Sequence, residues 1–178
     1  MMSSWKNIAM LGTAVTLWLS SNTAMANEEA VLSIDLPTLD VAEYHKPYVA
    51  VWVEDAKRKA TQIAVWYDVD KREQKGKEWL KDLRQWWRRG GRSLDLPYDG
   101  LTSATKGPGQ YTIDTQLNTA LKNMPAGEYT LRVEVSREVG GREVVSLPFA
   151  LPLSKNGFPI EAKGTSEVGR VALTTHGE

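Results

Sequence analysis

The sequence predicts a mainly β protein: an antiparallel, immunoglobulin-like β-sandwich of about seven strands with one inserted amphipathic helix. Three observations predict this fold. Short segments rich in β-branched and aromatic residues recur along the chain, turn residues separate them, and only one segment has helical periodicity. A chain of 178 residues is also long enough to bury a sizeable core within one domain.

The beginning of the chain is expected to be an export signal. Lys6 supplies a positive start, an apolar run from Ile8 to Leu19 follows, and Ala24-Met25-Ala26 has the form of a cleavage site. This run is shorter than the about 20 apolar residues that span a bilayer. We therefore expect a cleaved signal peptide over residues 1–26, a single domain over residues 27–178, and a periplasmic protein that is not embedded in the membrane.

Six segments are predicted to be strands, and the clearest of them is Tyr129–Val135, in which apolar and polar residues alternate. Gly140-Gly141 then turns the chain into its neighbour, and the charged residues 55–59 suit a second hairpin connection. Trp52 and Trp66 are expected to pack on adjacent strands. The predicted strands are Ala30–Leu36, Tyr48–Glu54, Ala60–Asp68, Tyr129–Val135, Arg142–Leu147 and Val168–Thr174.

The insert between the third and fourth strands is predicted to be a helix over about residues 76–89, because its apolar residues recur at helical spacing and Gly90-Gly91 follows them. Its apolar face comprises Trp79, Leu80, Leu83, Trp86 and Trp87, and its other face carries Lys77, Lys81, Arg84, Arg88 and Arg89. We expect Trp79 to lie in the core. For Trp86 and Trp87, both core packing and stacking on an aromatic ligand remain open.

Composition argues against several classes of function. The 22 Lys and Arg residues balance 22 Asp and Glu residues, which disfavours nucleic acid as the main partner. The absence of cysteine excludes thiol catalysis, iron–sulfur clusters and disulfides. His45 and His176 are the only histidines, too few for a histidine-based metal site, and no nucleophile-elbow, Walker A or dinucleotide-binding motif is present. No metal site is therefore predicted.

Residues 90–109 are predicted to form a functional loop, because long segments of this Gly-, Pro- and Ser-rich composition inside a compact domain commonly bind or react. The loop contains Asp99-Gly100-Leu101-Thr102-Ser103-Ala104-Thr105. This stretch resembles the D-x-x-[ST]-G-A-[ST] signature at which a flavin transferase attaches FMN to extracytoplasmic flavoproteins, as a phosphoester on the last residue. The positions that match are Asp99, Thr102, Ala104 and Thr105, whereas Ser103 stands where the signature has Gly.

The resemblance implies that Thr105 accepts FMN and that Asp99 helps the transferase to place the loop. Lys106, which follows the acceptor, is expected to balance the charge of the phosphate. Arg88, Arg89 and Arg92 would do the same if the loop folds back on the helix.

The chain beyond the leader also resembles a family of predicted periplasmic proteins known as domain of unknown function 2271. The matching stretches are Pro47–Asp55, Ile63–Asp68, Lys77–Trp87, Thr102–Gly109, Ala126–Glu138 and Gly164–Leu173. Members of that family resemble accessories of flavin systems, and they tend to occur beside flavin transferases and membrane proteins with PepSY domains. The resemblance implies a role in electron transfer or in its assembly.

Two functions from different classes follow. The first is a periplasmic accessory of a flavin-dependent redox system, an electron carrier rather than an enzyme, with covalent FMN on Thr105 and a membrane-bound reductase as its partner. The alternative is a cofactor-free β-sandwich binding module, whose basic helix and tryptophans dock a membrane or periplasmic partner. A hydrolase with paired carboxylates ranks last, because no spacing of acidic residues points to one.

Overall fold

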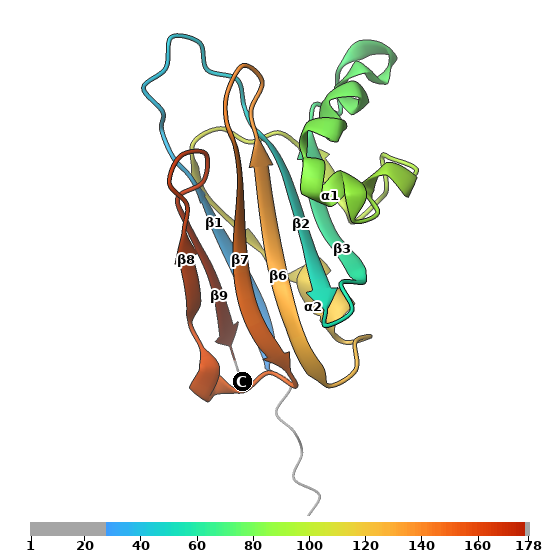
Figure 1. Cartoon of the computed structure of the whole chain (residues 1–178), viewed down its shortest axis with the longest axis vertical. Helices are drawn as coiled ribbons and strands as arrows, with labels where there is room; N and C mark the ends of the chain where they lie inside the picture. Colours follow the sequence, from blue (N-terminus) through green and yellow to red (C-terminus); the bar gives the residue numbers. More distant parts are fainter. Residues whose placement is uncertain (1–27, 177–178) are drawn as a thin grey trace, which may run out of the picture.

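The computed structural model describes residues 28–176, which form a β-sandwich of two sheets (Figure 1). The first sheet consists of β5 (Gly109–Ile113), β1 (Glu29–Leu36), β9 (Arg170–His176) and β8 (Ile160–Lys163), in that order. The second consists of β4 (Thr102–Ala104), β3 (Ala60–Tyr67), β2 (Tyr48–Asp55), β6 (Gly127–Ser136) and β7 (Arg142–Leu151). The predicted signal peptide, residues 1–26, lies outside the described residues.

The mainly β sandwich and all six predicted strands are confirmed, and β4, β5 and β8 are additional to them. Asp55 shapes the β2–β3 hairpin as predicted, since its Oδ1 accepts hydrogen bonds from the backbone N–H of Lys57 and Lys59, both at 2.8 Å. The second sheet is mixed rather than purely antiparallel, because β3 and β4 pair in parallel. This pair follows from the long connection between the two strands, which brings the chain back to the same end of the sheet before it enters β4.

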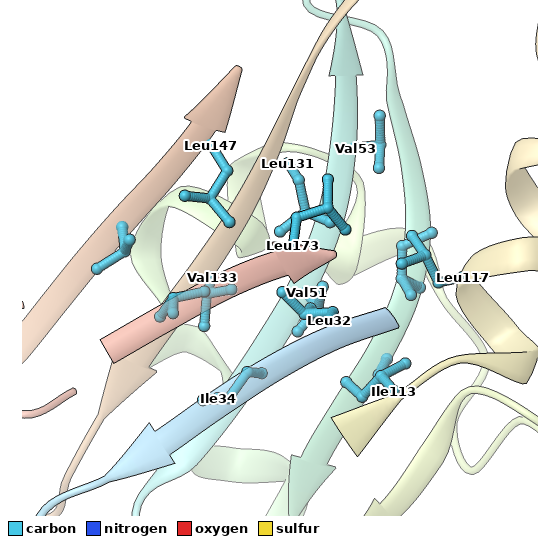
Figure 2. Close-up of a cluster of buried hydrophobic side chains, with 14 of the residues drawn as sticks. Leu32, Ile34, Val51, Val53, Ile113, Leu117, Leu131, Val133, Leu147 and Leu173 are labelled. Atoms are coloured by element: carbon cyan, nitrogen blue, oxygen red, sulfur yellow. The ribbon is translucent and has the colours of Figure 1, made fainter. Parts of the chain in front are cut away.

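The space between the sheets holds the main core, which Figure 2 shows in close-up. Alternate residues of the long strands point into it, including Val51 and Val53 of β2 and Leu131 and Val133 of β6. A short helix that the sequence analysis did not predict, α2 (Thr115–Leu121), adds Leu117 to the same core. The alternation of side chains along a strand therefore accounts for this part of the fold.

The other face of β2 and β3 is covered by three short helical segments, η1 (Arg72–Asp82), α1 (Arg84–Arg88) and η2 (Gly91–Ser93), which we call the outer layer. Figure 1 shows it as a separate, green layer beside β3. It closes a second apolar cluster, formed by Tyr48, Ala50, Trp52, Val65, Tyr67, Leu80, Leu83, Trp86 and Leu96. Because β2 is thus covered on both faces, its residues from Tyr48 to Glu54 are all buried, which explains their nearly unbroken apolar sequence.

The prediction of one continuous helix over residues 76–89 is wrong in form. A 3₁₀ segment and a five-residue α-helix meet at Leu83, whose ψ of 67° is not helical. Leu80 and Leu83 are three residues apart, so the tighter 3₁₀ turn places both on the buried side. The same geometry turns Trp79 outward, where 39% of it is exposed, so its predicted core position is also wrong.

The remaining tryptophans of these segments lie on the inner side of the outer layer. Trp86 is fully buried, and its Nε1 donates a hydrogen bond of 2.6 Å to Gln62 Oε1. Trp87 is half-buried against the second cluster. Trp52 and Trp66 are also buried, as predicted, although they belong to different clusters. Trp86 therefore packs in the core and is not free to stack on a ligand.

Candidate functional site

A cleft of about 580 Å³ lies at one end of the sandwich, where β2 begins and β3, β4 and β6 end. Its lining comes from segments far apart in the sequence: Tyr44, His45, Lys46, Tyr48, Asp68, Val69, Asp70, Lys71, Trp79, Asp82, Ala104, Thr105, Ser136 and Glu138. The parallel pairing of β3 and β4 builds its centre. Tyr67 of β3 pairs with Ala104 of β4. The residues that follow them, Asp68 and Thr105, therefore lie side by side where the two strands end.

Thr105 and Asp68 make direct contact in this cleft. The Thr105 hydroxyl donates a hydrogen bond of 2.9 Å to Asp68 Oδ1. The second carboxylate oxygen, Oδ2, lies 3.2 Å from the Lys71 ammonium. Asp68 is partly exposed, with 32% of its side chain accessible, and Thr105 is half-buried. The hydroxyl is therefore held in one orientation at a surface that a ligand can reach.

The other residues of the predicted motif are divided between the two ends of β4. Ala104 is exposed and lines the cleft next to Thr105. Thr102 begins β4, and its Oγ1 accepts a hydrogen bond of 3.0 Å from the backbone N–H of Tyr98. Asp99 is exposed in the turn just before it. Of the motif, Ala104 and Thr105 line the cleft, whereas Asp99 and Thr102 lie at the other end of β4, outside it.

The cations expected to meet a phosphate lie elsewhere. The Lys106 ammonium is 5.0 Å from the ring centroid of Trp66 and 5.2 Å from that of Tyr111, so it anchors the segment after Thr105 by cation–π contact. Arg89 is engaged by Glu54 on the sheet, at 3.1 Å from its Oε1. The lysines that do line the cleft are Lys46 and Lys71, which the sequence analysis did not single out.

Aromatic and acidic side chains complete the cleft. The hydroxyl of Tyr48 donates a hydrogen bond of 2.9 Å to the backbone oxygen of Gly76, which ties η1 to the beginning of β2. Burial, and then the nearby charge of Asp68, raises the pKa of Tyr48 far above its ordinary value, so this phenol stays neutral. His45 lies between two carboxylates, with Nε2 at 3.0 Å from Glu43 and Nδ1 at 3.7 Å from Glu138.

Buried carboxylates fasten the outer layer, which supplies Trp79 and Asp82 to the cleft. Glu134 of β6 is fully buried and accepts hydrogen bonds from the backbone N–H of Gln85, at 3.0 Å, and of Trp86, at 2.6 Å. Arg142 pairs with the same carboxylate at 2.8 Å. Glu134 therefore satisfies the free N–H groups at the start of α1, a role that the sequence did not reveal because it joins residues about fifty positions apart.

Comparisons with known proteins place the chain in a family. Residues 29–170 match the family described as "Predicted periplasmic protein (DUF2271)". No curated protein and no solved structure matches the chain. Over residues 28–176, no helix has the length and apolar character needed to cross a membrane, and no three metal-ligating side chains gather at one point. The family match spans β1 to β8 and every residue that lines the cleft, so the chain belongs to this family of periplasmic proteins.

Proposed function

We propose that this protein is a periplasmic accessory of a flavin-dependent redox system and that it carries FMN as a phosphoester on Thr105. The observation that supports this most directly is the position of the Thr105 hydroxyl. It lies in the cleft, it is oriented by Asp68, and its neighbour Ala104 is small and exposed. An acceptor residue needs this combination, because another enzyme's active site must reach its oxygen.

The residues around Thr105 fit a flavin. Cofactor-sized ligands occupy clefts of about 300–1,000 Å³, and this cleft has about 580 Å³. Trp79, with 39% of its surface exposed, offers an indole face on which a flat ring can stack. Lys46 and Lys71 supply positive charge for the phosphate. Bound FMN would add reversible one- and two-electron chemistry, which this chain's own side chains lack.

Attachment also has a consequence for the contacts in the cleft. The Thr105 oxygen forms a bond to the flavin-side phosphorus of FAD, the bond from that phosphorus to AMP breaks, and the hydroxyl proton leaves. Thr105 then has no proton to donate to Asp68, so the hydrogen bond of 2.9 Å between them is lost. Lys71, at 3.2 Å from Asp68, is close enough to turn toward the new phosphate.

The partner that we propose is a membrane-bound reductase of the PepSY type, loaded alongside this protein by a flavin transferase. The cleft is open, and the outer layer beside it exposes several cations. These are Arg72, Lys75, Lys81, Arg84, Arg88 and Arg92. An open redox site next to a basic surface suits transient contact with an electron donor of opposite charge.

Intact mass and in-gel flavin fluorescence test the proposal on mature protein recovered from the periplasm of cells that contain the transferase. We expect an added mass of FMN less one water, lost in Thr105→Ala and retained in Thr105→Ser. Thr112→Ala is the matched control, because Thr112 is an exposed threonine of β5 that belongs neither to the motif nor to the cleft. An unmodified wild-type mass, in cells where another acceptor is loaded, would contradict the proposal.

That contrary result would favour the alternative, a cofactor-free binding module. The half-exposed Trp79 and the exposed cations of the outer layer are the observations that favour it. Under this alternative, Trp79→Ala would weaken binding to the partner while Thr105→Ala would not. Pull-down of the membrane reductase with each variant separates the two functions.

A further inference from the structure

We propose that Asp68 is the catalytic base for attachment of FMN to Thr105, so that the acceptor protein supplies this base itself. The inference rests on the proposed function, because it concerns the chemistry of the same hydroxyl. It adds a residue that lies outside the acceptor motif, 37 positions before Thr105 in the chain.

The hydrogen bond between the two residues has the direction that a base requires. The Thr105 hydroxyl is the donor and Asp68 Oδ1 is the acceptor, at 2.9 Å, which is within the reach of direct proton transfer. Since the single hydrogen points to Asp68, the lone pairs of the oxygen point elsewhere and remain available for attack. Lys71, 3.2 Å from Oδ2, fixes the carboxylate from its other side.

The arrangement is built by the sheet and not by flexible loops. Residues 65–67 of β3 pair with residues 102–104 of β4, and Asp68 and Thr105 follow these pairs directly. The backbone of Asp68 is also packed against Gly76, where an added Cβ would lie 2.0 Å from the Asp68 carbonyl oxygen. The carboxylate therefore occupies a defined position before any ligand enters, which is what efficient proton transfer needs.

The transfer step balances with Asp68 in this role. The Thr105 oxygen forms a bond to the flavin-side phosphorus of FAD, and AMP leaves with the electron pair of the broken phosphorus–oxygen bond. The hydroxyl proton passes to Asp68 Oδ1 and later to water. A protonated Asp68 does not repel the new phosphate, whereas an ionised one would, so proton transfer also removes an unfavourable contact between anions.

The motif's own acidic residue is less suited to this role. Asp99 is exposed in the turn before β4, at the opposite end of that strand from Thr105. Asp70 lines the same cleft, but its carboxylate makes no hydrogen bond to Thr105. Asp68 is thus distinguished from the nearby acids by direct contact with the reacting oxygen.

The test compares initial rates of FMN attachment in single-turnover reactions, with purified full-length mature protein, excess transferase and saturating FAD. Asp68→Asn keeps a hydrogen-bond acceptor of the same shape but removes the base. General-base catalysis contributes about 10²- to 10⁴-fold, so we expect Asp68→Asn to react at least about 10²-fold more slowly than wild type. Asp40→Asn, which changes an exposed aspartate outside the cleft, is the control and should retain the wild-type rate. Thermal unfolding of each variant verifies that it is folded.

A second variant separates base catalysis from mere anchoring of Thr105. Asp68→Ala leaves space for a small carboxylate, so added formate should raise its rate and leave wild type unchanged. A wild-type rate in Asp68→Asn, or no rescue of folded Asp68→Ala by formate, overturns the inference while the proposed function stands. Failure of wild-type Thr105 to accept FMN overturns both, so the two failures are distinguishable.

Discussion

The two faces of β2 show two different ways of holding this protein together. Val49, Val51 and Val53 face the first sheet and belong to the main apolar core. On the opposite face, Trp52 donates a hydrogen bond of 2.9 Å from its Nε1 to Glu54, and Glu54 also meets Arg89 at 3.1 Å. One strand thus separates a core held mainly by apolar contact from a core that contains buried charges.

This difference reflects what each face is packed against. Two sheets offer broad surfaces, and apolar contact between them needs no direction. The outer layer is made of segments too short to be stable helices alone, since isolated helices below about 12–15 residues are marginal. Directional contacts from Glu54 and Glu134 therefore add to the apolar packing of the outer layer in holding it on the sheet. The cleft depends on both kinds of packing, because part of its lining comes from the sheet and part, Trp79 and Asp82, from the outer layer.

The largest expected effect on stability is in the apolar core between the sheets. Leu131 is fully buried there, so Leu131→Ala should lower the free energy of unfolding by about 2–5 kcal/mol, through lost burial and the cavity it leaves. Urea unfolding measures this change. The outer layer should unfold in the same transition as the two sheets. A decrease in unfolding free energy of less than about 1 kcal/mol would contradict the prediction, because it would show that the core collapses around the gap.

A smaller and more local effect is expected from Glu134→Gln. The amide keeps one acceptor but loses the ion pair with Arg142 and one of the two backbone contacts, which should cost about 1.5–3 kcal/mol. Hydrogen exchange should show faster opening of residues 84–88 than of β6. Glu128→Gln, at an exposed position of the same strand, is the control. Equal protection of residues 84–88 in both variants would contradict the role of Glu134.

Glu143 makes a third kind of contact, which links the two sheets: its carboxylate in β7 accepts hydrogen bonds from the backbone of the segment before β9. Burial alone would raise the pKa of Glu143, but hydrogen bonds from the backbone N–H groups of Thr165, Ser166 and Val168 outweigh it and lower the pKa from 4.5 to about 2. Its stabilising contribution is therefore complete above the unfolded value of 4.5 and disappears as the pH falls toward 2.

Unfolding free energies of wild type and Glu143→Gln, measured from pH 7 down to pH 2, test this contact. The difference between the two proteins should be largest at neutral pH and should shrink through the interval between 4.5 and about 2. Subtracting the variant removes the titration of the other carboxylates. A difference that stays constant with pH would contradict the lowered pKa.

The smallest effect on stability is expected at the rim of the outer layer. Trp79 is 39% exposed, so Trp79→Ala should lower the unfolding free energy by about 1–2 kcal/mol, less than the loss of a fully buried tryptophan. In protein loaded with FMN, the same change should increase flavin fluorescence, because a stacked indole quenches it. Tyr98→Ala, which removes an exposed aromatic residue outside the cleft, is the control. Unchanged flavin emission in Trp79→Ala would argue against stacking.

Local patterns predicted the parts of this molecule that depend on local rules. Strict alternation identified β6, and the charged turn at Asp55 identified the β2–β3 hairpin. The acceptor motif drew attention to Ala104 and Thr105, which both line the cleft. The helical spacing around Trp79 led to a wrong prediction of one continuous helix, because spacing alone does not distinguish an α-helix from a tighter 3₁₀ segment packed on a sheet.

The sequence by itself determined six of the strands, the mainly β class and the candidate acceptor Thr105, since each depends on residues that are near one another in the chain, and its motifs in their order along the chain indicated the family. Only the tertiary structure decided that Asp68 meets Thr105 and that Glu134 holds α1. The physical reason is that these contacts follow from strand pairing. The parallel register of β3 and β4 joins residues 37 positions apart, and no local pattern in the sequence specifies that register.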